Sequence, residues 1–220
     1  MNNFYRRPNL GVKLKQRILD LCRQVNAHVL ENHPTADHSD YWGLCEFKHA
    51  EIVSYIDFEF HKNDIHYPLK DSLEVVLTDV PELQEFINEF NLHPYFGKAV
   101  SGNFGVHRHA FAPDATWNLC VLDKNTENSK VGFHYPVHGR ELFGPVTDDH
   151  FYDHLDNDRP VTTELSLDLG PEDIYSFNVW QWHSFTVPEN KKTDVYLFYF
   201  KNAGTAEEID KIIKRLETYE

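Results

Sequence analysis

Two short stretches decide the fold expected for this chain: Val106-His107-Arg108-His109 and Asn178-Val179-Trp180-Gln181-Trp182-His183-Ser184-Phe185. Each places histidine inside a run typical of a β-strand. A strand holds its side chains on alternate faces at a fixed spacing, so neighbouring strands of a small barrel can bring distant histidines within reach of one ion. The two stretches therefore predict a mononuclear metal site inside a β-barrel.

The rest of the second half agrees with a barrel. Beyond His93, short apolar runs are separated by Gly, Pro, Asn and Asp, which is typical of a sandwich or jelly roll. We expect strands at 99–107, 116–122, 130–135, 161–169, 173–180, 182–187 and 193–200. Strict alternation predicts one further strand at 51–60, and residues 35–48 and 144–160 are expected to be loops.

Helices are expected at three places outside the barrel. Apolar residues recur at helical spacing from Val12 to Leu30 and again over 81–91, where Pro81 suits a first helical turn. The sequence Thr205-Ala-Glu-Glu208 is a capping box that opens a C-terminal helix over 205–219. We expect a single domain over 1–220, mainly β with α, with additions over 1–98 and a jelly-roll core over 99–201.

Composition excludes several classes of function. The net charge of −14, from 21 basic and 35 acidic residues, argues against binding to nucleic acid, which needs clustered Lys and Arg. No run approaches the 18 or so apolar residues of a membrane span, so no membrane partner is expected. Three widely spaced cysteines and no apolar leader predict reduced thiols in a cytoplasmic protein. A small-molecule or peptide substrate remains as the expected partner.

The histidines need weighing, because the chain has 14 of them and chance alone gives about one His-x-His pair. His107 and His109 would share one face of a strand, and imidazole suits iron, zinc and copper. His183 stands among Trp180, Trp182 and Phe185, aromatic residues that would keep a metal dry. The alternative is that all three are ordinary hydrogen-bonded histidines at the surface or at the edge of the core.

The chain also resembles a known family over about residues 99–200. The resemblance is carried, in order, by Gly-Val-His-x-His, Thr-Trp-Asn-Leu-Cys-Val-Leu, Asp-Ile-Tyr-Ser-Phe-Asn-Val-Trp-Gln-Trp-His-Ser-Phe-Thr-Val-Pro and Val-Tyr-Leu-Phe-Tyr-Phe. This order is similar to the iron(II)/2-oxoglutarate-dependent oxygenases, in particular to small aspartyl/asparaginyl-hydroxylase-like and cyanophage-type members. The resemblance implies a double-stranded β-helix, also called a cupin-like jelly roll, with iron(II) as metal and 2-oxoglutarate as cosubstrate. It implies His107 as first ligand, His183 as distal ligand, and Asn118 as the polar residue that faces the cosubstrate.

The second ligand position departs from the family. It holds His109, where the family usually has a carboxylate, and an imidazole there would raise the net charge of the metal and alter its redox behaviour. The expected metal ligands are therefore His107, His109 and His183. A register with His109 as first ligand would leave Phe111 at the second position, and Asp114 would supply a carboxylate only if its loop turned back.

The anchor for the keto acid is a second departure. Relatives place Arg or Lys on the strand after the distal histidine, but no arginine occurs here between Arg159 and Arg215. Lys192 is the candidate anchor; the alternative is that Lys191 and Lys192 lie at a solvated turn. Arg108 would point away from the metal ligands because it alternates with them.

Three functions remain open from the sequence. The leading one is a 2-oxoglutarate-dependent non-haem iron hydroxylase of a small molecule or an amino-acid side chain, with His134, Tyr135 and His138 as possible residues at its mouth. The second is a three-histidine cupin, a dioxygenase or isomerase that needs no keto acid. The third is a jelly-roll binding or structural module without catalysis, because a fold alone does not define a function.

Overall fold

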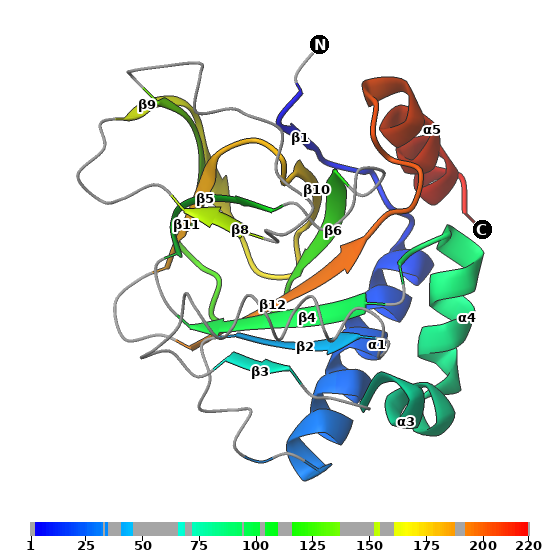
Figure 1. The fold of residues 1–220 in the computed structure, drawn as a ribbon. Coiled ribbons are helices and arrows are strands. Elements are labelled where there is room, and N and C mark those ends of the chain that lie inside the picture. The colour runs from blue at the N-terminus through cyan, green and yellow to red at the C-terminus, as the bar shows by residue number, and fades with distance from the viewer. Residues whose placement is uncertain are drawn as a thin grey trace.

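Two β-sheets facing each other form the body of the protein (Figure 1). The computed structural model describes residues 3–32, 34, 41–45, 66–68, 72–93, 95–101, 104–109, 116–136, 152–154, 161–187 and 192–219. The seven-stranded sheet has the order β1 (Tyr5–Arg6), β10 (Ile174–Asn178), β6 (Trp117–Leu122), β12 (Lys192–Tyr199), β4 (Tyr95–Ser101), β2 (Tyr41–Cys45) and β3 (His66–Pro68). The five-stranded sheet has the order β8 (Tyr152–His154), β5 (Phe104–His109), β11 (His183–Thr186), β7 (Ser129–Pro136) and β9 (Val161–Leu169).

The strand order is that of a double-stranded β-helix. From β4 to β7 each successive strand joins the other sheet, and β9 to β12 alternate in the same way. All pairs among these strands are antiparallel, whereas β2 and β3 pair in parallel at the edge. The predicted jelly roll is confirmed, although its first strand begins at Tyr95 and not at residue 99.

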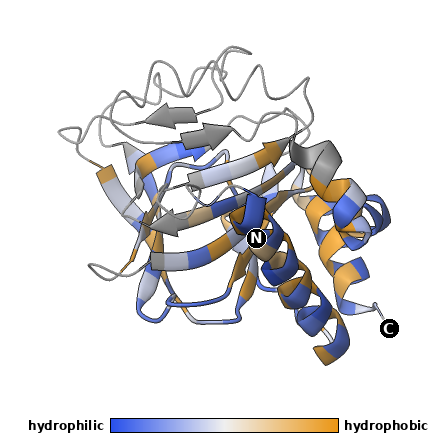
Figure 2. Cartoon of the chain, turned by 90° about the horizontal axis from the view of Figure 1, so that it is seen from below, coloured by the Kyte–Doolittle hydropathy of each residue, from blue (hydrophilic) through white to orange (hydrophobic). Residues whose placement is uncertain are grey.

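Within the described residues, four helices lie against the outer face of the seven-stranded sheet: α1 (Val12–Asn32), α3 (Ser72–Asp79), α4 (Pro81–Phe90) and α5 (Ala206–Glu217) (Figure 1). Apolar and polar residues alternate along them (Figure 2). The predicted helices at 12–30, 81–91 and 205–219 are confirmed, the last with its capping box between Thr205 and Glu208. None of the described helices is long and apolar enough to cross a membrane.

Strand alternation divides the core into two apolar clusters. In β6, Trp117, Leu119 and Val121 belong to the cluster under the helices, whereas Cys120 and Leu122 belong to the cluster between the two sheets. We call these the helix-side core and the barrel core. Cys22 and Cys120 are buried, and both are free thiols, as predicted.

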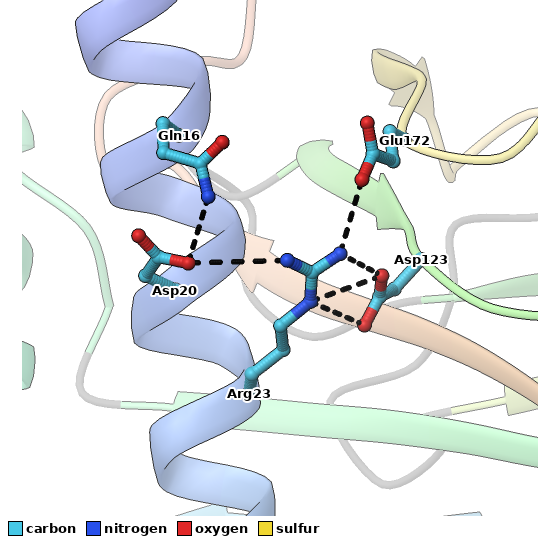
Figure 3. A network of polar contacts seen from close by, with 5 residues as sticks. All are labelled: Gln16, Asp20, Arg23, Asp123 and Glu172. Atoms are coloured by element: carbon cyan, nitrogen blue, oxygen red, sulfur yellow. Dashed lines mark hydrogen bonds and ion pairs between the residues drawn. The ribbon is translucent and has the colours of Figure 1, made fainter.

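Two groups of polar contacts join α1 to the barrel. Arg23 donates through Nε to Asp123 Oδ2 at 3.0 Å and lies 3.2 Å from Glu172 Oε1 (Figure 3). The ammonium of Lys98, whose side chain is 2% exposed, lies 2.6 Å from Asp194 Oδ1 and 2.8 Å from Asn26 Oδ1. A buried charge is tolerated only when it is paired in this way.

Several expectations about the remaining strands were wrong. Residues 41–45, expected in a loop, form β2, and residues 152–154 of the long expected loop form β8. The single strand expected at 99–107 is two strands, β4 and β5, in different sheets. The helix α3 and the strands β1 and β3 were not predicted, and the strand expected at 51–60 lies outside the described residues.

Candidate metal centre

The pairing of β5 with β11 places the side chains of His107 and His183 next to each other. The two residues are direct partners in the antiparallel register, and their ring centroids are 4.4 Å apart at an interplanar angle of 52°. Both are buried, at 5% and 7% exposure. The His183 ring also lies 6.3 Å from the ring of Phe133, which belongs to the barrel core. The two imidazoles therefore lie on the inner face of the five-stranded sheet, against the barrel core.

Backbone carbonyls orient both rings in the same way. His107 Nδ1 lies 2.7 Å from the Gly105 carbonyl oxygen, and His183 Nδ1 lies 2.8 Å from the Gln181 carbonyl oxygen. A carbonyl only accepts, so each Nδ1 carries the proton and each Nε2 carries the lone pair. Metal-binding histidines are commonly held by this kind of contact, which fixes the tautomer and the plane of the ring.

Burial keeps His183 in the form that can bind a metal. Loss of hydration lowers the pKa of His183 to about 4; the bond to the Gln181 carbonyl opposes this shift and the nearby His134 adds to it. The imidazole is therefore neutral at pH 7, and a neutral imidazole is the ligand form.

The spacing of the two rings fits one shared metal ion. With about 2.1 Å for a metal–imidazole bond and roughly 1.1 Å from nitrogen to ring centre, two imidazoles at a right angle have centroids about 4.5 Å apart. The observed 4.4 Å agrees with that value. Among the described side chains no group of three or more His, Cys, Asp or Glu is placed to hold a metal.

Two further histidines flank this pair in the backbone register. His109 is the last residue of β5, two positions beyond His107, and pairs with Tyr152 of β8. His154, the last residue of β8, is the direct partner of His107. His154 was not considered from the sequence, because residues 144–160 were expected to form a loop.

Arg108 stands between the two histidines of β5, and its side chain lies on the opposite face of the strand from that of His107. Its guanidinium carbon lies 5.0 Å from the centroid of the Trp182 ring, and the arginine is buried. Trp182 directly precedes His183. The cation–π contact therefore ties the end of β5 to the start of β11 behind the histidine pair.

His134 also lies on this outer face of the five-stranded sheet, not beside the pair. Its Nε2 lies 2.7 Å from Ser184 Oγ, and its Nδ1 lies 3.2 Å from Thr163 Oγ1. Burial lowers the pKa of His134. The ring lies over Gly132, where an added Cβ would come within 2.8 Å of Nε2. His134 thus links β7, β9 and β11, while Tyr135 is exposed and His138 lies outside the described residues.

The two residues expected to bind the cosubstrate lie on the seven-stranded sheet. Asn118 is buried on β6, and its Oδ1 accepts a hydrogen bond from the Phe177 backbone N–H at 3.3 Å. Lys192 begins β12 opposite Ser101, just before a register shift, and is thus in a strand and not in a turn. Two basic side chains are buried in the described part of the chain, Lys98 and Arg108, and neither faces the barrel core.

Comparison with known proteins gives only distant likenesses. No family model and no curated protein matches the sequence. Among solved structures, AviO1 from Streptomyces viridochromogenes is 12% identical with a TM-score of 0.40, and 92% of each chain is covered. An oxidoreductase of the 2OG-Fe(II) oxygenase family from Burkholderia pseudomallei is 10% identical with a TM-score of 0.30, over 66% of this chain and 64% of that one.

The first structures in the comparison are vicilins. Vicilin from Corylus avellana is 11% identical with a TM-score of 0.30, over 53% of this chain. The alignment spans only 25% of the vicilin chain. These likenesses are distant, and the strand order by itself establishes the double-stranded β-helix.

Proposed function

We propose that this protein is a non-haem iron(II) oxygenase that uses 2-oxoglutarate to hydroxylate a small molecule or an amino-acid side chain. The observation that carries the proposal is the buried pair of His107 and His183, partners across β5 and β11 with ring centroids 4.4 Å apart. The two rings lie together inside a double-stranded β-helix, and the imidazole of His183 is neutral at pH 7. Bound iron(II) with a keto acid would supply the oxidising power to break a C–H bond.

The surrounding residues suit such a site. His107 and His183 would hold the iron, with His109 of β5 as a further ligand. Phe133 and Phe177, whose ring centroids are 6.0 Å apart, would form an apolar wall that excludes water. Asn118 and Lys192 stay as candidates for contact with 2-oxoglutarate, Lys192 through its ammonium and Asn118 through its amide nitrogen.

A second function is favoured by one specific observation. Among the described residues, neither buried basic side chain faces the barrel core, where a keto acid would need a cationic partner for its distal carboxylate. A cupin whose metal is held by histidines alone would need no such partner. This dioxygenase or isomerase without a keto acid is the alternative.

One experiment separates the two functions. The protein is loaded with iron(II) without oxygen, and 2-oxoglutarate is added while the visible spectrum is recorded. The proposal predicts a weak charge-transfer band that depends on both additions and is absent from His183→Ala. Iron binding with no response to 2-oxoglutarate would favour the histidine-only cupin. No iron binding at all would overturn both and leave a jelly-roll module without a metal.

A further inference from the structure

Three aromatic side chains connect the histidine pair to the surface of the barrel. The ring of Phe133, fully buried on β7, lies 6.3 Å from the ring of His183. The ring of Phe4 lies 5.1 Å from that of Phe133 and 6.1 Å from that of Tyr135. Tyr135 is 41% exposed. The series of rings therefore begins beside the proposed metal centre and ends at solvent.

Strand alternation puts Tyr135 on the same face of β7 as Phe133. Phe133 is the direct partner of His183, and position 135 is two residues further along the strand, or about 6.6 Å. The contacts of Phe4 with both rings agree with this placement. Tyr135 therefore lies within the length of a small molecule of the histidine pair.

Phe4 reaches this place because the N-terminal segment adds to the edge of the other sheet. The strand β1 pairs with β10, where Tyr5 is opposite Phe177. The Phe4 carbonyl accepts a hydrogen bond from the Asn178 backbone N–H at 2.8 Å. The Phe4 side chain is partly buried against the barrel core. Two segments that belong to different sheets thus supply neighbouring aromatic rings.

Tyr135 is exceptional in its exposure. Among the described residues, the large apolar side chains with high exposure are Val12 and Tyr135, and Val12 begins α1 on the helix side. Small-molecule sites are lined mainly by apolar and aromatic side chains beside a few polar groups. Aromatic groups also gain from ring contacts beyond the area that they bury. A flat apolar group is therefore the ligand chemistry that fits these rings.

We infer that Phe4 and Tyr135 bind the substrate through an aromatic ring that the substrate carries. This inference rests on the oxygenase function proposed above and deepens it by naming a substrate class. The aromatic group lies against Phe4 and Tyr135, while the C–H bond to be oxidised points toward the histidine pair. Phe133 forms the apolar wall between these two places. The phenol hydroxyl of Tyr135 has no part in this contact, because the ring face makes it.

Binding of indole, a flat and neutral probe, tests the inference without an activity assay. Its dissociation constant is measured by saturation-transfer NMR for metal-free wild type, Tyr135→Ala, Tyr135→Phe, Phe4→Ala and Tyr219→Ala. We expect Tyr135→Ala and Phe4→Ala each to weaken binding roughly three- to tenfold, through loss of one ring contact. Tyr135→Phe should bind as wild type does, because the ring remains. Tyr219→Ala is the control, since it removes a ring that packs on Phe90 on the helix side.

Bound cobalt(II) then relates the probe to the metal centre. The indole signals should broaden in cobalt-loaded protein and not in zinc-loaded protein, because a paramagnetic ion relaxes only nearby protons. Equal indole affinity in wild type, Tyr135→Ala and Phe4→Ala would overturn the inference, as would no binding of indole or no broadening by bound cobalt. Cyclohexanol that binds as tightly as indole would overturn the aromatic substrate class. Failure of the protein to bind cobalt would instead overturn the proposed centre, while the variants of the metal-free protein would still show whether these rings hold an aromatic ligand.

Discussion

Buried polar groups have different partners on the helix side of the protein and on the inner face of the five-stranded sheet. On the helix side, buried charges are matched: Lys98 lies against Asp194, and Asp123 accepts from Arg23. On the inner face of the five-stranded sheet, the buried imidazoles of His107 and His183 are held by backbone carbonyls. The first arrangement satisfies charges within the protein and fastens α1 to the sheet. The second brings two imidazole rings to a centroid distance of 4.4 Å, a spacing that fits two ligands of one external ion.

If this contrast is correct, the largest effects on stability belong to the helix-side core. Phe198 is fully buried there, with its ring 5.0 Å from that of Phe96 and 5.3 Å from that of Phe86. Phe198→Ala should lower the free energy of unfolding by about 4 kcal/mol, because it removes apolar burial and leaves a cavity. Urea denaturation followed by circular dichroism measures this. A loss below about 1 kcal/mol would mean that this cluster does not carry the fold.

A charged pair on the same side gives the next effect. Asp194→Ala would leave the Lys98 ammonium buried without its carboxylate, which should cost about 3 kcal/mol. The control is Glu207→Ala, which breaks an exposed pair with Lys211 and should leave the free energy of unfolding almost unchanged. Equal losses in the two variants would contradict the contrast between buried and exposed charges.

The stability that the buried His183 contributes should depend on pH. In the metal-free protein, burial lowers the pKa of His183 to about 4, against about 6.5 in an unfolded chain. The unfolded state therefore binds the proton first as the pH falls. The stability that the neutral, buried imidazole contributes is complete above about pH 6.5 and is lost between about pH 6.5 and 4.

The matched variant for this titration is His183→Gln, which cannot take up the proton. Between pH 7 and 4.5, wild type should lose on the order of 2–3 kcal/mol more unfolding free energy than the variant does. Chemical denaturation at a series of pH values measures the difference. Parallel curves would show that His183 is not buried in its neutral form.

The smallest effect concerns the outer face behind the metal centre. Gly132→Ala would place a Cβ 2.8 Å from His134 Nε2 and 3.1 Å from Ser184 Oγ, so the ring must move and its bond to Ser184 must break. We expect a loss of about 1–2 kcal/mol. In the double variant Gly132→Ala/His134→Ala the glycine substitution should cost much less, because the ring is gone. Additive losses would exclude the steric explanation.

Local signals made much of this fold predictable. The apolar face of α1, the proline that opens α4 and the capping box of α5 are encoded within one or two helical turns. The strand β9 was predicted with its observed bounds, because an apolar and polar run ends there at Gly170. Such elements need no knowledge of what they pack against.

Edge strands were not predictable in the same way. Gly43 stands inside β2, and β8 is only three residues long, so neither has the alternation that marks a half-buried strand. Their partners, β4 and β5, define them as strands. His107 and His183 could be named from the sequence, because both lie in runs typical of a β-strand. The pairing of β8 with β5 became visible only through the register.

The most direct test of the central claim is an anaerobic calorimetric titration of the metal-free protein with iron(II), beside the variants His107→Ala and His183→Ala. The account predicts one iron per chain in wild type and no measurable binding in either variant, while both keep the circular dichroism spectrum of the folded barrel. Binding of one iron with unchanged affinity in both variants would contradict it.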